Sequence, residues 1–78
     1  MTLFTIVDDG YDVDVYKSVK SVVEFITGNE LRLSEDSERA ATDKEARNAV
    51  KNCEYVLYLY AEDFNGWKYR VERQNRVF

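Results

Sequence analysis

The first sixteen residues alternate apolar and polar side chains with a period of two, which is typical of a β-hairpin. Residues 2–7 are rich in β-branched and aromatic side chains, and Asp9-Gly10 is a preferred two-residue turn. The alternation resumes at residues 11–16. A two-residue turn predicts three cross-strand pairs: Asp8 with Tyr11, Ile6 with Val13 and Phe4 with Val15. We therefore expect one apolar face, with the aspartates of the second strand on the other face.

A helical spacing of apolar residues follows this hairpin. Ser18 is a good N-terminal cap, and Gly28 stands where a helix often ends in a left-handed residue. The apolar positions form one stripe: Val19, Val22, Val23 and Ile26. The many β-branched residues leave a strand as the alternative. Residues 30–33 fit either a short strand or a connector.

A second helix is predicted near the middle of the chain. Thr42 and Glu45 match a capping box, in which each residue's side chain binds the other's backbone N–H. The apolar stripe is Ala46, Ala49, Val50 and Cys53. The helix could also begin earlier, at Ser34 or Ser37.

The last third of the chain predicts a second hairpin. Residues 55–61 are apolar on both faces, as in a central strand, and Asn65-Gly66 is a preferred two-residue turn. The expected cross-strand pairs are Phe64–Trp67, Asp63–Lys68, Tyr60–Val71 and Tyr58–Arg73. Charges along residues 67–77 indicate an edge strand, because they oppose pairing with other chains.

These elements predict one α+β domain over residues 1–78, in the order β-β-α-(β)-α-β-β. The expected architecture is an antiparallel sheet from two β-hairpins with two helices packed on one face. With no signal-peptide pattern, no apolar stretch of about 20 residues and one cysteine, the chain is expected to be a cytoplasmic protein.

The composition argues against catalysis. The chain has no histidine and one cysteine, so it lacks the commonest general base and cannot build a zinc site from cysteines. The glycines stand at turn or cap positions rather than in a phosphate-binding loop. Cys53 lies on an apolar helical stripe and is expected to be structural. We predict neither enzymatic activity nor a cofactor, and the spacing of the hairpin aspartates does not fit a calcium loop, so no metal is expected.

Charge is distributed unevenly along the chain. Residues 1–45 contain eleven acidic and five basic residues, whereas residues 46–78 contain four acidic and six basic ones. An acidic surface can attract a partner with a basic surface, although solubilising charge is the simpler interpretation. The candidate partner-binding residues are Asp8, Asp9, Asp12, Asp14, Glu35, Asp36 and Glu38.

The C-terminal hairpin suggests an alternative. Aromatic and basic residues interleave there, as in sheets that bind single-stranded nucleic acid. The basic candidates are Lys68, Arg70, Arg73 and Arg76. The predicted register places the aromatic and basic residues on opposite faces, which makes nucleic acid an unlikely partner. A third hypothesis is a homodimer that pairs through the C-terminal edge strand, residues 67–77.

In general character the chain resembles small phage-encoded host-takeover and anti-defence proteins, including anti-CRISPR proteins. These are similarly short, acidic, α+β and without catalytic residues. The resemblance implies a non-enzymatic inhibitor that binds a larger host protein in the host cytoplasm, and it carries over no individual residue.

Overall fold

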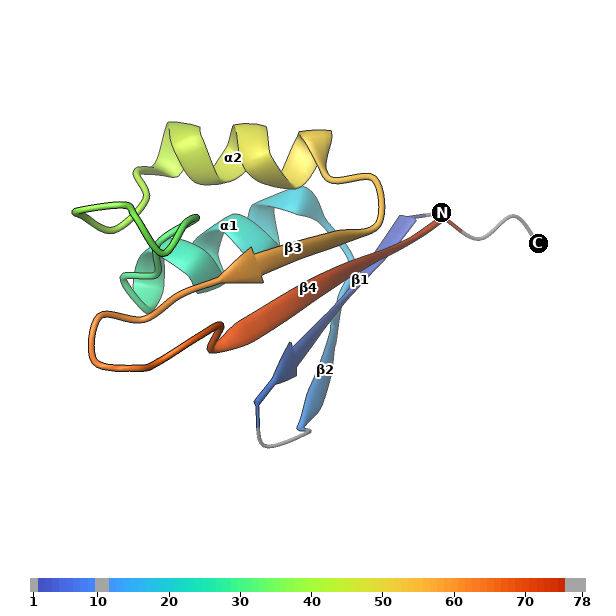
Figure 1. Cartoon of the computed structure of the whole chain (residues 1–78). Coiled ribbons are helices and arrows are strands. Elements are labelled where there is room, and N and C mark those ends of the chain that lie inside the picture. Colours follow the sequence, from blue (N-terminus) through green and yellow to red (C-terminus); the bar gives the residue numbers. More distant parts are fainter. Residues whose placement is uncertain (1, 10–11, 76–78) are drawn as a thin grey trace.

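The computed structural model describes residues 2–9 and 12–75. Along this part of the chain the elements are β1 (Thr2–Asp8), β2 (Val13–Tyr16), α1 (Val19–Gly28), α2 (Asp43–Asn52), β3 (Val56–Leu59) and β4 (Tyr69–Asn75). The strands form one antiparallel sheet in the order β2-β1-β4-β3. Both helices lie on the same face of the sheet (Figure 1). The predicted α+β fold and element order are confirmed, and the optional middle strand is a single bridge between Arg32 and Tyr60.

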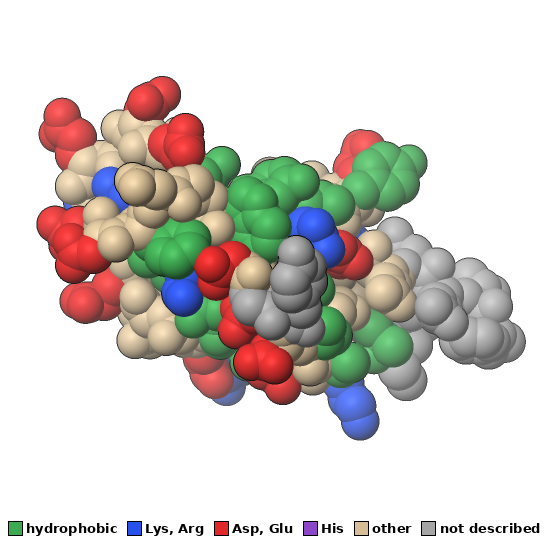
Figure 2. All heavy atoms as spheres, turned by 60° about the horizontal axis from the view of Figure 1, so that its bottom comes forward, with side chains coloured by type: hydrophobic (Ala, Val, Ile, Leu, Met, Phe, Trp, Pro, Cys, Tyr) green, Lys and Arg blue, Asp and Glu red, His purple; other side chains and the backbone are tan. Residues whose placement is uncertain are grey.

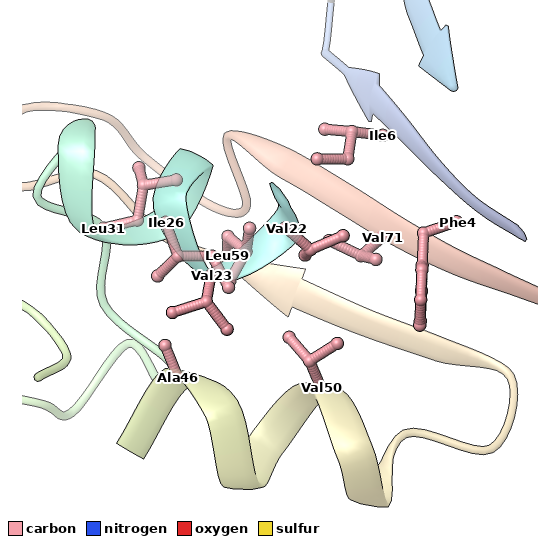
Figure 3. Packing of buried hydrophobic residues seen from close by; sticks show 10 residues of the cluster. All are labelled: Phe4, Ile6, Val22, Val23, Ile26, Leu31, Ala46, Val50, Leu59 and Val71. Atoms are coloured by element: carbon pink, nitrogen blue, oxygen red, sulfur yellow. The ribbon is translucent and has the colours of Figure 1, made fainter. Parts of the chain in front are cut away.

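The core lies between the sheet and the two helices (Figure 3). The predicted helical stripes are confirmed, since Val22, Val23 and Ile26 of α1 are buried together with Ala46 and Val50 of α2. The other buried members of the cluster come from the sheet and from the segment after α1: Phe4, Ile6, Leu31, Leu59 and Val71. Burial of these apolar side chains is the main favourable contribution to folding.

Local capping defines where each helix begins. The Ser18 hydroxyl accepts a hydrogen bond from the Ser21 N–H at 3.1 Å, as predicted for the N-cap of α1. Thr42 and Glu45 form the predicted capping box, so α2 begins at Asp43 and not at Ser34 or Ser37. These contacts satisfy N–H groups that have no partner within the helix.

The C-terminal end of α1 differs from the prediction. Asn29 is its C-cap, and the left-handed residue is Glu30, with φ of 53°, rather than Gly28. The Leu31 N–H then donates to the Ile26 carbonyl at 3.1 Å, which turns the chain so that Leu31 enters the core. A left-handed conformation costs energy for any residue other than glycine. The burial of Leu31 in the core offsets this cost at Glu30.

The first hairpin is shifted by one residue from its predicted register. Ile6 lies opposite Asp14 and Phe4 opposite Tyr16, so the predicted partners Val13 and Val15 are wrong, and Asp14 shares the helix side with Ile6 rather than the opposite face on which it was predicted. The shift brings the aromatic ring of Tyr16 to the helix side, where it packs edge-on against Phe25 of α1 with 5.8 Å between ring centroids. We attribute the register to the larger apolar area of this aromatic pair. The Gly10 turn and the Tyr11 pairing lie outside the described residues.

The second hairpin is shifted further and has a longer loop. Tyr58 lies opposite Arg70, Leu57 opposite Val71 and Leu59 opposite Tyr69, so the four pairs predicted from a tight Asn65-Gly66 turn are wrong. Gly66 does have a positive φ of 79°, but it lies inside a connection that spans residues 60–68. On the edge away from β4, the backbone N–H and carbonyl of Tyr60 bind the carbonyl and N–H of Arg32.

The positions of the last two strands in the sheet are the reverse of those predicted. β4 lies between β1 and β3, whereas β3 is the edge strand. The charges of β4 are accommodated within the sheet: Arg70 pairs with Glu72 at 2.7 Å, and the Arg73 guanidinium donates to the carbonyls of Lys51 and Cys53. The described part of residues 67–77 therefore does not form the edge strand through which a homodimer was predicted, because β4 pairs with β1 along Tyr69–Asn75 and with β3 along residues 69–72.

Candidate protein-binding surface

Three connections of the fold lie toward one end of the molecule, where residues 60–68 contact both the segment 29–42, through the Arg32–Tyr60 bridge, and the first hairpin, through the hydrogen bond from the Asp9 N–H to the Lys68 carbonyl. Each connection follows an element that runs toward this end. The β1–β2 turn follows β1, the segment 29–42 follows α1, and residues 60–68 follow β3. Figure 1 shows these connections at the left and bottom of the molecule, away from the described ends of the chain. The topology alone thus brings together loops that are far apart in sequence.

These three connections carry most of the acidic side chains. We define the acidic end by the carboxylates of Asp8, Asp9, Asp12, Glu30, Glu35, Asp36, Glu38, Glu62 and Asp63. In Figure 2 acidic side chains gather over the left end of the molecule, and others lie near the centre of the view. Six of the seven predicted partner-binding residues belong to this end; the seventh, Asp14, lies further along β2, where it is exposed.

The aspartates of the first hairpin have local roles in the turn. The Asp8 carboxylate accepts the backbone N–H of Asp12 at 3.0 Å, and the Asp8 N–H donates to the Asp12 carbonyl at 3.0 Å. Asp9 forms an ion pair with Lys68 at 3.5 Å. Partial burial raises the pKa of Tyr16, and the negative charge of Asp14 raises it further. This part of the acidic end is partly neutralised and structurally engaged.

The segment before α2 presents its acids more freely. Its backbone is held by Arg32, whose guanidinium donates to the carbonyls of Ser37 and Ala61 at 3.2 and 3.1 Å. The three predicted acids of this segment, Glu35, Asp36 and Glu38, are exposed, and within the described part of the chain none of them forms an ion pair. Their charges therefore remain available to a partner.

Residues 60–68 lie between the aspartates of the first hairpin and the acids of the segment before α2. The sequence interpretation did not include the acids of this connection, Glu62 and Asp63, among the candidate site residues. The Asp9 N–H donates to the Lys68 carbonyl at 3.1 Å, which ties this connection to the first hairpin. Glu62 lines one hollow with Glu30 and Glu38, which Arg32 and Arg39 also line, and another with Glu30, Asp63 and Lys68. Two adjacent acids directly after an apolar strand were a signal for an acidic loop, but the sequence interpretation placed Asp63 in a strand opposite Lys68.

The basic residues of the nucleic-acid hypothesis do not converge. Arg70 lies on the helix-free face, Arg73 reaches carbonyls at the end of α2, and Lys68 pairs with Asp9. Arg76 lies outside the described residues. The guanidinium of Arg70 lies 5.4 Å from the ring centroid of Trp67, so an aromatic and a basic residue share a face after all, contrary to the predicted register. Because Arg70 is paired with Glu72, this arrangement provides little positive charge for phosphates.

The helix-free face of the sheet is partly apolar. The valines of β2 are more than half exposed there, Val13 at 56% and Val15 at 59%, and on β3 Val56 and Tyr58 are exposed by 42% and 41%. Tyr58 also contacts Trp67, with 5.8 Å between ring centroids. This face and the acidic end are the two candidate surfaces for a partner.

No family model, curated protein or solved structure matches the chain. The functional argument therefore rests on the chemistry of the surfaces. Over residues 2–9 and 12–75, no three histidine, cysteine, aspartate or glutamate side chains are grouped so that they could hold a metal ion. None of the helices in this part of the chain is long and apolar enough to cross a membrane. Burial raises the pKa of the Cys53 thiol, which disfavours the reactive thiolate at neutral pH.

Proposed function

We propose that this chain is a non-enzymatic inhibitor that binds a basic surface of a larger protein through its acidic end. The target class is a nucleic-acid-handling protein of the host cytoplasm, and the chain acts as a phage-encoded anti-defence protein of the anti-CRISPR kind. The observation that carries the proposal is that the acidic connection 60–68 contacts two others that also carry acids, the segment 29–42 and the first hairpin.

The distribution of charge supports a directed encounter with a basic partner. The opposite end carries exposed basic residues, including Lys17, Lys20 and Lys51. Glu54 also lies beside Lys51, and Arg39 lies among the acids of the segment 29–42, but carboxylates outnumber cations at the acidic end, and a positively charged groove would attract the molecule by that end. Such complementarity accelerates association and selects the partner more than it adds affinity. A groove that normally binds nucleic-acid phosphates provides the required positive charge.

The local structure of the segment 29–42 supports recognition by preformed contacts. Arg32 holds its backbone at two carbonyls, and the ion pair between Arg39 and Glu45 at 2.7 Å ties it to the start of α2. A loop held in this way loses less conformational entropy on binding than a free one. The exposed acids next to these anchors are thus the residues expected to contact the partner first.

The test uses a panel of purified effectors: CRISPR nucleases, restriction endonucleases and bacterial RNA polymerase. We expect stoichiometric inhibition of one of them, weakening as the salt concentration rises. The triple variant Glu35→Lys, Asp36→Lys and Glu38→Lys should raise the inhibition constant about tenfold or more, because several charges of the contact surface change sign.

The matched control reverses charge at the other end of the molecule. The variant Lys17→Glu, Lys20→Glu and Lys51→Glu changes as many charges but leaves the acidic end intact, so it should inhibit at least as well as the unmodified chain. Equal loss in both variants, or inhibition that the first variant leaves unchanged, would contradict the acidic mode of binding. Failure to inhibit any effector of the panel would overturn the inhibitor proposal.

A further inference from the structure

A hollow between the two helices is lined mostly by basic residues. It has a volume of about 240 Å³ and lies where the first turn of α1 is beside the second half of α2. The residues that line it are Val19, Lys20, Arg47 and Lys51. Among the described residues that line it, none is acidic. We call this site the basic hollow; it lies away from the acidic end, which follows the other end of α1.

The three basic side chains have hydrogen-bond donors available for a ligand. All three are exposed, and within the described part of the chain neither Lys20 nor Lys51 forms an ion pair. Arg47 pairs with Asp43 through one nitrogen, Nη2, at 3.1 Å. A guanidinium has five N–H donors, so this pair leaves donors for a second acceptor. The basic hollow can therefore offer charged donors from both helices to one anion.

The position of Lys20 is unfavourable for the helix that carries it. Lys20 lies in the first turn of α1, which contains no acidic residue, although the positive end of a helix dipole favours a carboxylate. Lys51, by contrast, stands in the last turn of α2, where a cation is favourable. A residue that breaks a local rule without a gain to the fold is typical of a functional site. An anion in the basic hollow would offset the unfavourable charge of Lys20.

Charged residues around the basic hollow limit the size of the anion. Lys17 precedes α1 and adds positive charge, whereas Glu24 lies one turn beyond the hollow on α1 and Asp43 one turn before it on α2. Glu54 lines the neighbouring hollow together with Lys51. A strand of nucleic acid would bring its other phosphates close to these carboxylates and be repelled, whereas a single compact anion would not.

We propose that the basic hollow binds a phosphate group, either of inorganic phosphate or at the end of a small phosphate ester. The three lining cations and the paired carboxylate of Asp43 leave a net charge of +2. A phosphate monoester carries a charge of about −1.5 to −2 at neutral pH, which matches this value. The site is separate from the acidic end, so its failure leaves the inhibitor proposal untouched.

An NMR titration of the purified chain tests the proposal. Inorganic phosphate and glycerol 3-phosphate are added in turn at constant ionic strength, replacing chloride. Both should shift the backbone amide resonances of residues 18–20 and 47–51 in a saturable manner and leave those of the acidic end unchanged. The tighter of the two ligands identifies the source of the phosphate group.

Charge variants at exposed positions then locate the site. Lys20→Gln and Lys51→Gln should each raise the dissociation constant about fivefold or more, because each removes a charge-assisted hydrogen bond to phosphate. The matched control is Lys44→Gln, at an exposed position of α2 outside the hollow, and it should bind as the unmodified chain does. Asp43→Asn should tighten binding about twofold, since it removes a negative charge and releases Arg47. This gain cannot result from a loss of folding.

Three results would overturn the proposal. One is a set of shifts that grow without saturation and equal those caused by chloride. Another is an equal loss of affinity in Lys20→Gln and Lys44→Gln. The third is tighter binding of a single-stranded oligonucleotide without a terminal phosphate than of glycerol 3-phosphate, because an extended polyanion would then be the preferred ligand.

Discussion

The two faces of the sheet are built from alternate residues of the same strands, yet their environments differ sharply. On the helix side, Phe4, Leu59 and Val71 are at most 1% exposed. On the other side, Val15 is 59% exposed and Tyr58 41% exposed. β-branched and aromatic residues occur on both sides, so residue type does not distinguish them. The helices cover one face, whereas on the other face the central position Val7 is buried at 8% exposure and the apolar residues of the edge strands β2 and β3 are left to solvent or to a partner.

This contrast teaches that an apolar residue in a strand can serve two different purposes. On the helix side it contributes to stability through burial and close packing. On the helix-free side it contributes little to the folded monomer, and its exposure fits a role in association. Substitutions at matched positions on the two faces should separate these roles.

The largest effect is expected for a buried valine compared with an exposed one. Val71→Ala should lower the free energy of unfolding by about 2–3 kcal/mol, because it removes buried methyl groups and leaves a cavity. Val15→Ala should change it by about 0.5 kcal/mol or less, since solvent already covers that side chain. Urea denaturation followed by circular dichroism measures both, and equal costs would show that the two faces do not differ as described.

A smaller effect is expected for the rate at which a thiol reagent modifies a buried cysteine compared with one on the helix-free face. Cys53 is 7% exposed, and its pKa is raised by burial, so it should react slowly with a thiol reagent at neutral pH. A cysteine introduced as Val15→Cys should react about tenfold faster or more, because it lies on the exposed face. The variant should thus show two kinetic phases that merge in denaturant. A single fast phase would contradict the burial of Cys53.

The smallest effect is expected for the exposed ion pair between Arg39 and Glu45 at the start of α2, which belongs to neither face of the sheet. Hydrogen bonds from the Arg39 guanidinium and the Thr42 N–H lower the pKa of Glu45 to about 2. Because the folded pKa lies below the unfolded one, this stabilisation is present above the unfolded value of about 4.3 and is lost as the pH falls toward 2.

The matched variant is Glu45→Gln, which keeps the shape and an acceptor oxygen but not the charge. Its stability should depend less on pH below about 5 than that of the unmodified chain, as thermal unfolding at several pH values would reveal. Identical pH profiles would mean that this exposed ion pair contributes nothing measurable.

Local sequence signals predicted the parts of this fold that depend on neighbouring residues. The caps at Ser18 and Thr42 and the apolar stripes of both helices are confirmed, because each depends on residues within a few positions of one another. The acids of the segment before α2 were also identified from sequence. Glu62 and Asp63 were not, because their place beside that segment depends on the Arg32–Tyr60 bridge, whose residues are far apart along the chain.

The sequence by itself determined the element types, their order and the acidic character of the connections. Only the tertiary structure decided the registers of both hairpins and which of the last two strands lies inside the sheet. The physical reason is that a strand's neighbours are chosen by long-range packing: β4 pairs with β1, and Tyr16 packs on Phe25. These contacts compete with the turn preferences of Asp9-Gly10 and Asn65-Gly66. They prevail because the free energy gained by burying apolar surface in these contacts exceeds the local preference of the two dipeptides for a tight turn.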